Sequence, residues 1–428
     1  MNIGLLIVVL ALLFIGIALS GFYPAFVLSS YNPIDALKSG VLKPRGIRFR
    51  SALMVLQSAI SLIMISGTFI VYEQLNYMRS KDLGIDIERT LVVETPELHD
   101  NTNRSAANVF RSNIQGLPFV SGFSMSSVVP GQELTFRSYN LSNLRTKSTI
   151  NCGIIGVDND FFRNFDLKMI AGGMIPERDS SGLGVIVNEE VVTQLGFASA
   201  SESIGASILH SNKGNTTEFI IEGVVSNYHQ RSLQRSYEPM LFRMGTDIKF
   251  YSIKFEQHGF TDLKSNLALV EYEFKKIFPD DAFHFFFLDQ HFDDLYRSEV
   301  RLGSTLFALS LLAIFISALG LLSLSTFMIT LRVKEIGIRK VIGASTLSIT
   351  TLFMRDYYQL LAVSTLIGTP VSYFVSTHWL NNFAFKIDVS PLLLAIPIIF
   401  LSTVILLAVG FQSFRAASRN PADVIKSE

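Results

Sequence analysis

Five long stretches of the chain carry no acidic or basic side chain apart from one histidine. They are residues 1–34, 51–72, 302–331, 357–385 and 389–414. A helix needs about 20 apolar residues to cross the ~30 Å hydrocarbon core of a bilayer, and each stretch is long enough. A helix also satisfies its own backbone amides in lipid. Apolar helices buried in soluble cores seldom reach these lengths. We therefore predict an integral membrane protein with a bundle of five transmembrane helices.

The charges between these stretches predict the orientation, because basic residues of short loops stay on the cytoplasmic side. Lys and Arg concentrate after the first stretch, after the third and in the C-terminal tail. They are Lys38, Lys43, Arg45, Arg48 and Arg50, then Arg332, Lys334, Arg339, Lys340 and Arg355, then Arg415, Arg419 and Lys426. The loop between the fourth and fifth stretches has only Lys386. We expect the three basic segments inside the cell, and the long segment after the second helix outside.

These patterns divide the chain into segments. We expect a transmembrane helix at 1–31, a basic cytoplasmic linker at 32–50, a second transmembrane helix at 51–73, an extracytoplasmic domain at 74–300 and a C-terminal membrane domain at 301–428. Within the last we expect helices at about 302–331, 356–377 and 390–414, and a cytoplasmic helix at 332–350. The first helix lacks the basic start of a signal peptide and runs into a basic loop, so we expect it to be retained.

The segment 74–300 has the mixed pattern of an α+β domain inserted between the second and third transmembrane helices. Apolar spacing predicts helices at 103–117 and 261–278. Strands are expected at 154–157, 184–187, 218–225, 250–255 and 283–288, with Gly, Asn, Asp and Ser between them as turn signals. The ends of the domain, 71–83 and 289–301, read as helices that extend the adjoining membrane spans. Such extensions transmit motion if they have two arrangements, or they simply overshoot the membrane.

The composition excludes several classes of function. The 36 basic and 36 acidic residues balance without a dominant basic block, which argues against a nucleic-acid partner. Cys152 is the only cysteine, so no intramolecular disulfide and no cysteine-based metal site is expected. No Gly-Lys dipeptide occurs, so there is no P-loop and ATP hydrolysis is not expected. No HExxH or GxSxG pattern occurs either, and we expect neither an enzyme nor a cofactor.

One cluster raises the alternative of a metal site. His284, His291, Asp289, Asp293 and Asp294 lie close together in the sequence. Imidazole and carboxylate groups are metal ligands. A polar helix face beside a membrane commonly carries such residues without binding anything, and we favour that interpretation.

The most distinctive segment is 332–345, with the sequence RVKEIGIRKVIGAS. Glu335 precedes Arg339 by four residues, which favours a helix. Ile338, Val341 and Ile342 fall on one face of that helix. The glycines of this segment allow close approach or an end to the helix. A short charged amphipathic helix between two membrane spans either lies on the lipid surface or is a docking element for a cytoplasmic protein.

A second signal is internal duplication. Residues 32–40 read NPIDALKSG and residues 420–428 read NPADVIKSE. Each follows an apolar stretch that contains a Gly-Phe pair. Transporters are often built from two such repeats. The first helix and its tail would then be the end of a first half, and the residues from Arg50 onward a complete second half, so that the chain begins late. Chance similarity of nine residues is the alternative.

These motifs resemble one family, the FtsX-like and MacB-like permeases of ABC transporters (type VII), and in particular their C-terminal half. The resemblance rests on KEIGIRKVIGAS and on the layout, and it covers essentially the whole chain. Weaker matches are Val187-Asn188-Glu189, Ile204-Gly205 and 221–228 (IEGVVSNY), which resemble pieces of the MacB-like periplasmic core domain.

The resemblance implies a mechanism called mechanotransmission, in which a separate cytoplasmic ATPase drives shape changes of the periplasmic domain. It implies an ATPase-docking coupling helix formed by Lys334, Glu335, Gly337, Ile338, Arg339, Lys340 and Gly343. Export or extraction of a peptide, drug or lipoprotein would take place on the periplasmic side of a bacterial inner membrane. Further partners would be membrane lipids, a second permease half or second copy, and a periplasmic adaptor. The alternative is a membrane-anchored sensor or ligand-binding module.

Overall fold

The computed structural model describes residues 11, 14, 47–96, 102–134, 140–143, 145–176, 182–212, 215–245 and 247–418. The chain divides into two compact units, Met1–Gln57 and Ser58–Glu428, and apart from the first residues of α3 the features below belong to the second. Apart from residues 11 and 14, the helix expected at 1–31 lies outside the described residues. The two repeated segments at 32–40 and 420–428 lie outside them as well.

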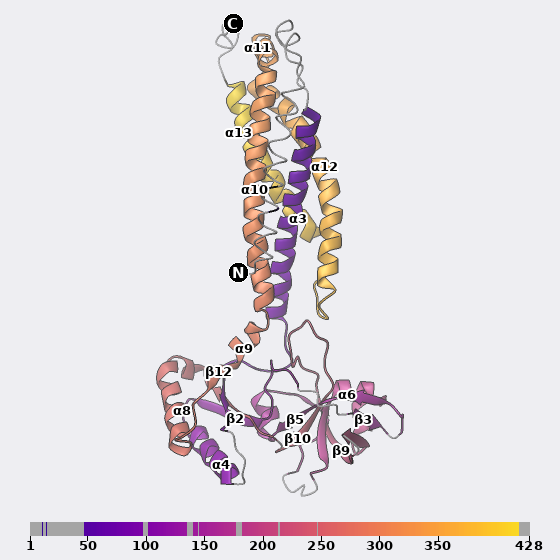
Figure 1. The fold of residues 1–428 in the computed structure, drawn as a ribbon, viewed down its shortest axis with the longest axis vertical. Helices are drawn as coiled ribbons and strands as arrows, with labels where there is room; N and C mark the ends of the chain where they lie inside the picture. The colour runs from indigo at the N-terminus through magenta and orange to yellow at the C-terminus, as the bar shows by residue number, and fades with distance from the viewer. Residues whose placement is uncertain are drawn as a thin grey trace. The chain divides into compact units, whose positions relative to one another are not determined.

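Four helices of the described part are long and apolar enough to cross a membrane (Figure 1). They are α3 (Ile47–Ser80), α10 (Arg297–Leu331), α12 (Thr346–Leu380) and α13 (Pro391–Ala417). Four of the five predicted spans are therefore present as helices. The whole segment rich in strands lies between α3 and α10 in the sequence.

Hydroxyl and glycine contacts join these helices. Ser61 Oγ and Ser317 Oγ lie 3.0 Å apart between α3 and α10. A Cβ added at Gly368 of α12 would lie 3.0 Å from Leu62 Cδ2 of α3, so a larger residue there would push the two helices apart. Small residues and interhelical hydroxyl bonds are the usual means by which helices associate in lipid, where apolar burial gives little driving force.

We call the domain expected at 74–300 the outer domain, and its described residues form one sheet of 12 strands in the order β12-β1-β11-β2-β5-β10-β7-β9-β8-β3-β4, with β6 paired to β9. The strands are β1 (Thr90–Glu94), β2 (Val120–Ser126), β3 (Asn140–Asn143), β4 (Thr149–Asn151), β5 (Gly153–Val157), β6 (Met169–Gly172), β7 (Gly184–Asn188), β8 (Ser207–Asn212), β9 (Asn215–Val225), β10 (Met240–Met244), β11 (Phe250–Phe255) and β12 (Phe285–Phe287). The sheet is mixed, because β5 pairs parallel to β10 and β7 parallel to β9 while the other pairings are antiparallel.

Helices cover the two ends of this sheet. The helices of the domain are α4 (Thr102–Gln115), α5 (Asp160–Asn164), α6 (Glu189–Gln194), α7 (Ala200–Ser203), α8 (Leu263–Ile277), α9 (Leu288–Asp294) and the 3-10 turn η1 (Gln257–Phe260). α4 and α8 lie side by side at one end and bury Phe110 and Phe274 against β1, β2 and β11 (Figure 1). α6 buries Val191 against β7 and β9 at the other end. The predicted α+β class is therefore confirmed.

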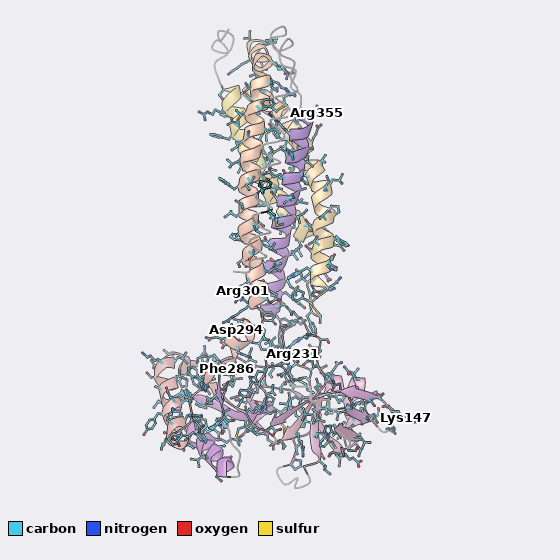
Figure 2. The ribbon with its side chains drawn as sticks, viewed as in Figure 1. Lys147, Arg231, Phe286, Asp294, Arg301 and Arg355 are labelled. Carbon is cyan, nitrogen blue, oxygen red and sulfur yellow. The ribbon has the colours of Figure 1, made fainter. Side chains whose placement is uncertain are left out.

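The predicted elements differ from the structure mainly at their ends. The strand expected at 283–288 is shorter, because α9 already begins at Leu288. The helical extension expected at 71–83 ends at Ser80. The extension expected at 289–301 is not one helix, because the chain turns at Leu295 and Tyr296 between α9 and α10. Asp294 and Arg301 mark the two sides of this joint (Figure 2). The side chain of Tyr296 is buried there, so the joint is held by packing.

Candidate functional site

A short helix, α11 (Val333–Val341), follows α10 after a single non-helical residue, Arg332. α10 has 35 residues, which places α11 about 50 Å from the joint with α9 along the helix axis. Arg332 forms an ion pair with Asp356 of α12 at 3.5 Å. The residue that connects α10 to α11 is therefore also held to α12 by charge.

The end of α11 is defined by a glycine. Gly343 has a φ of +100°, a conformation that residues with a Cβ adopt at a cost. Its N–H donates to the carbonyl of Lys340 at 3.1 Å, and the N–H of Ala344 donates to the carbonyl of Arg339 at 2.9 Å. These two bonds form the Schellman motif, which satisfies the last carbonyls of a helix. The sequence predicted one helix over 332–350, and this prediction is wrong because the motif stops the helix.

The next helix begins at once. Ser345 is the N-cap of α12, and its Oγ accepts the N–H of Ser348 at 3.2 Å. An N-cap serine satisfies an otherwise unpaired amide in the first turn. The four residues between Val341 and α12 are thus fixed by a C-cap on one side and an N-cap on the other. We call residues 341–347 the exposed turn.

One face of α11 is anchored. Ile336 is 8% exposed and packs with Ile349 of α12, which is 2% exposed. Ile329 of α10 and Ala344 pack against the same pair. Gly337 is buried beside Ile336. This apolar face of α11 is therefore already covered by side chains of the same chain.

The opposite face and the exposed turn carry apolar side chains that nothing in the described part of the chain covers. Ile338 is 59%, Val341 67%, Ile342 79% and Leu347 73% exposed. Beside them, Arg339 forms an ion pair with Glu335 at 2.7 Å one helical turn away. The site thus combines a ridge of large aliphatic side chains with charged groups held along the helix.

The predicted site residues differ in how exposed they are in the structure. Glu335, Ile338 and Arg339 lie on the exposed face of α11, and Lys340 is half-buried. Gly337 and Gly343 have structural positions, one buried and one ending the helix. Lys334 belongs to the first turn of α11, and its side chain is outside the described residues. The predicted set omits Val341, Ile342 and Leu347, although the apolar spacing of the first two was visible in the sequence.

A second site, not predicted from the sequence, joins the membrane helices to the outer domain. Gln74 of α3 is fully buried. Its Nε2 donates to the carbonyl of Phe385 and its Oε1 accepts the N–H of Ile387, both at 2.9 Å. Phe385 and Ile387 belong to the loop between α12 and α13. We call this loop, residues 381–390, the outer loop.

The outer loop also pairs with the sheet domain. The N–H groups of Ala384 and Phe385 donate to the carbonyls of Gln234 and Leu233, each at 3.1 Å. The N–H of Leu233 in turn donates to the hydroxyl of Tyr296, at the joint between α9 and α10, at 3.2 Å. Residues 233–234 of the domain therefore contact the membrane helices at two places, through the outer loop and through Tyr296.

Aromatic rings cover these backbone contacts. The ring of His229 lies 4.6 Å from the rings of both Tyr237 and Phe385. His229 is buried, and burial, aided by the positive charge of Lys81, lowers its pKa to about 4. The imidazole is therefore neutral near pH 7. The rings of Trp379 and Phe383 lie 4.8 Å apart, and Trp379 also packs against the core of the outer domain. Trp379 therefore has a packing role.

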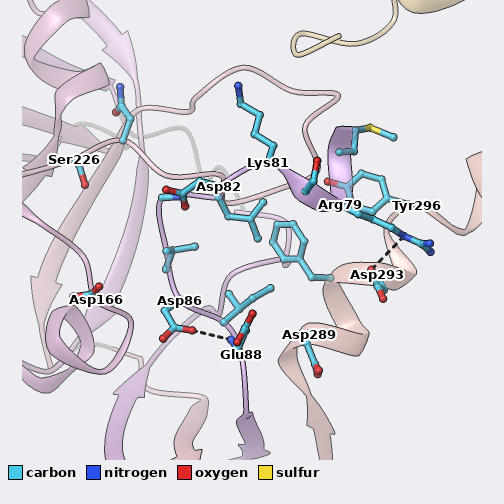
Figure 3. A pocket seen from close by; sticks show the side chains of 18 of the residues that line it. Arg79, Lys81, Asp82, Asp86, Glu88, Asp166, Ser226, Asp289, Asp293 and Tyr296 are labelled. Atoms are coloured by element: carbon cyan, nitrogen blue, oxygen red, sulfur yellow. Dashed lines mark hydrogen bonds and ion pairs between the residues drawn. The ribbon is translucent and has the colours of Figure 1, made fainter. Parts of the chain in front are cut away.

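A cavity of about 870 Å³ opens beside this junction, between the end of α3 and α9 (Figure 3). Charged side chains line it from α3, from α9 and from the segment that follows α3. They include Asp82, Asp86, Asp289 and the exposed pair of Arg79 and Asp293, whose Nε and Oδ1 atoms lie 3.9 Å apart. Among the described side chains, no group of three or more His, Cys, Asp or Glu is placed to hold a metal ion.

Residues 307–421 match the sequence model of the FtsX-like permease C-terminal family. This range contains α11 and the exposed turn. The chain is also 21% identical over 264 residues to the macrolide export ATP-binding/permease protein MacB 2 of Aeromonas hydrophila subsp. hydrophila. The resemblance to the FtsX-like and MacB-like permeases is confirmed. The match covers 61% of this chain and 39% of the relative, so the chain spans well under half of the relative's length.

Two solved structures are similar to this chain. The periplasmic region of MacB from Actinobacillus actinomycetemcomitans is 14% identical, with 48% of this chain and 92% of that chain covered and a TM-score of 0.32. The extracellular domain of the noncanonic ABC-type transporter YknZ from Gram-positive bacteria is 14% identical, with 41% of this chain and 88% of that chain covered and a TM-score of 0.28. The family match and the four apolar helices fit a multi-pass inner-membrane protein.

Proposed function

We propose that this chain is a permease subunit of an ABC transporter, or half of one, and that a separate cytoplasmic ATPase drives it by binding α11 and the exposed turn. The observation that carries the proposal is the aliphatic ridge of Ile338, Val341 and Ile342, which is exposed on a segment fixed by caps and anchors. Aliphatic side chains held rigidly at a surface are typical of protein interfaces.

Helix length argues against lipid as the partner of this ridge. The apolar part of α10, residues 302–331, has the length to span about 45 Å. That length equals the bilayer with both of its headgroup layers. α11 and the exposed turn then lie at or beyond the inner headgroups, where the ridge would meet water unless a protein covers it. The orientation assumed here is the one predicted from the basic loops.

Two routes connect this site to the outer domain. One runs along α10 to Tyr296, and the other runs along α12 to the outer loop, and both end at residues 233–234. An ATPase that favours one position of α11 when ATP is bound would shift the whole chain between two states, since a ligand shifts an equilibrium by its differential affinity. We propose that this mechanotransmission serves export or extraction of a peptide, drug or lipoprotein on the outer side.

The test is capture of the motor. The tagged full chain is purified from its native membranes, and the co-purified proteins are identified by mass spectrometry. We expect a P-loop ATPase that hydrolyses ATP. Ile342→Asp should reduce its capture at least tenfold, because a carboxylate would have to be buried in an apolar interface. Arg339→Glu should also reduce capture, and Arg339→Lys should retain most of it.

The control variant has to place a carboxylate at an exposed residue outside the membrane spans, which excludes residues such as Leu366 of α12. The control is Tyr272→Asp, a substitution of a residue on α8 of the outer domain that is 64% exposed. It should leave capture unchanged. If the wild-type chain captures no P-loop ATPase, or Ile342→Asp captures as much as the wild type, the proposal is wrong.

A further inference from the structure

The outer halves of α3 and α10 enclose a second cavity, of about 710 Å³, that shares only Arg79 with the cavity beside α9. It is lined from Ile65 to Arg79 on α3 and from Val300 to Ile314 on α10, with Phe400 of α13 at its side. We call it the outer-leaflet groove. From the structure we propose that this groove binds one phospholipid with an anionic headgroup.

The length of the groove fits one leaflet. Ile65 and Arg79 are 14 residues apart on one helix, as are Val300 and Ile314 on the other, which corresponds to about 21 Å. Half of a bilayer of about 40–45 Å, headgroups included, has the same thickness. A lipid whose headgroup lies level with Arg79 would therefore extend its chain to the level of Ile65.

The charged and amide side chains of the lining lie at the outer end of this length, while only the hydroxyls of Thr68 and Ser310 are polar deeper in the membrane. Asn76, Arg79 and Ser304 line its outer end. Phe69, Leu311 and Phe400 line the part deeper in the membrane, where Leu311 is 61% and Phe400 51% exposed. A transmembrane helix of a partner would present apolar side chains along the whole length. A lipid, with a polar head and an apolar chain, matches this gradient.

The floor of the groove is closed by direct contact between the two helices. The hydroxyls of Thr68 and Ser310 lie 2.9 Å apart. Near the outer end, a Cβ at Gly303 would lie 3.3 Å from Val71 Cγ1, which shows that the helices are already in close contact there. The groove is thus a furrow over a packed seam, and it can be filled only from the membrane.

Arg79 supplies the charge that selects the headgroup. Its only ionic partner among the described residues is Asp293, and the two side chains are 53% and 64% exposed. An exposed pair at 3.9 Å holds its members weakly. A basic residue at a membrane surface attracts anionic lipid, which predicts about a fivefold preference for an anionic over a zwitterionic headgroup.

The test is native mass spectrometry of the full chain extracted from nanodiscs that contain equal amounts of phosphatidylglycerol and phosphatidylcholine. We expect one retained phosphatidylglycerol per chain. Leu311→Trp, which fills the groove, should abolish retention. Leu366→Trp, at a lipid-exposed position of α12 outside the groove, should not. Equal retention by these two variants would overturn the proposal.

Two further variants test the headgroup. Arg79→Gln should retain a lipid but reduce the fivefold preference to about one. Asp293→Asn removes the competing carboxylate and should keep or increase the preference. A wild-type chain that shows no preference would overturn the assignment of an anionic headgroup. Disulfide cross-linking of Phe307→Cys between two copies in native membranes would overturn the proposal as a whole, because a second copy would then cover the groove.

Discussion

The side-chain amide of Gln74 is bonded to the backbone of Phe385 across more than three hundred residues of sequence, at a distance of 2.9 Å. The bond joins a membrane helix to the outer loop, and the same amide accepts the N–H of Ile387. A buried glutamine with both ends satisfied fixes the position of the loop. Through the loop it also fixes residues 233–234 of the outer domain.

Replacing Gln74 should release the outer loop. Gln74→Leu keeps the volume but leaves the Phe385 carbonyl and the Ile387 amide without their partner, which costs about 2 kcal/mol. We expect hydrogen exchange at residues 384–387 to increase about 30-fold, because each 1.4 kcal/mol is a factor of ten. Gln290→Leu, at an exposed glutamine of α9, is the control and should leave exchange in the loop unchanged. Unchanged exchange in both variants would show that the bonds do not hold the loop.

Substitutions of Ile336 and Ile338 in α11 should have different effects, one on the stability of the chain and the other on ATPase binding. Ile336→Ala creates a cavity at a residue that is 8% exposed, and it should destabilise α11 by about 2–4 kcal/mol. Ile338→Ala, at a residue that is 59% exposed, should leave thermal unfolding of the purified chain unchanged but weaken ATPase capture. The prediction fails if Ile338→Ala destabilises the chain as much as Ile336→Ala does.

Gly343→Ala should weaken ATPase capture through the backbone alone. A Cβ at this position would have nothing within 4 Å, so only its φ of +100° is unfavourable, at a cost of about 1 kcal/mol. Gly205 has a φ of +74° and equally open surroundings, and it lies in the outer domain. Gly205→Ala therefore imposes similar strain far from α11. We expect co-purification of the ATPase to fall for Gly343→Ala only.

The contacts between the outer loop and the outer domain around His229 should weaken in acid. Burial lowers the pKa of His229 to about 4 from its ordinary value of 6.5, so the unfolded chain binds this proton more readily than the folded chain. Stability from neutral His229 is therefore complete above pH 6.5 and is lost as the pH falls toward 4, by at most about 3 kcal/mol. Thermal unfolding between pH 7 and pH 4.5 measures this loss. His229→Gln should show a shallower pH dependence, and an identical dependence would exclude His229 as its source.

The sequence predicted the separate elements of this fold better than their arrangement. Long apolar stretches and alternating patterns are local signals, and four spans and all five expected strands were found where these signals lie. The order of the strands depends on pairings between distant residues, which no local pattern encodes. Within the candidate site, the spacing predicted the exposed face of α11. It left the stop at Gly343 open, because a glycine allows either close approach within a helix or an end to it.

Two of the weak motifs in the outer domain are in contact in the structure. Asn188 Nδ2 donates to Asn227 Oδ1 at 2.9 Å, and the N–H of Asn227 donates to Glu189 Oε2 at 3.0 Å. These bonds join the loop after β9 to the start of α6. The motifs were recognisable in the sequence, but their contact was not, because nearly 40 residues separate them. The bonds of Gln74 were invisible for a related reason, since they end on backbone groups that have no sequence signature.

The single thiol of the chain has a practical consequence. Cys152 follows β4 in the outer domain, is fully buried, and has its pKa raised by burial. Thiol reagents react with accessible thiolates, whereas the thiol of Cys152 is protonated and buried. A maleimide added to the folded chain should therefore label only cysteines introduced elsewhere. Single cysteines can therefore be introduced into the native sequence, without first replacing Cys152, to map which loops face each side of the membrane.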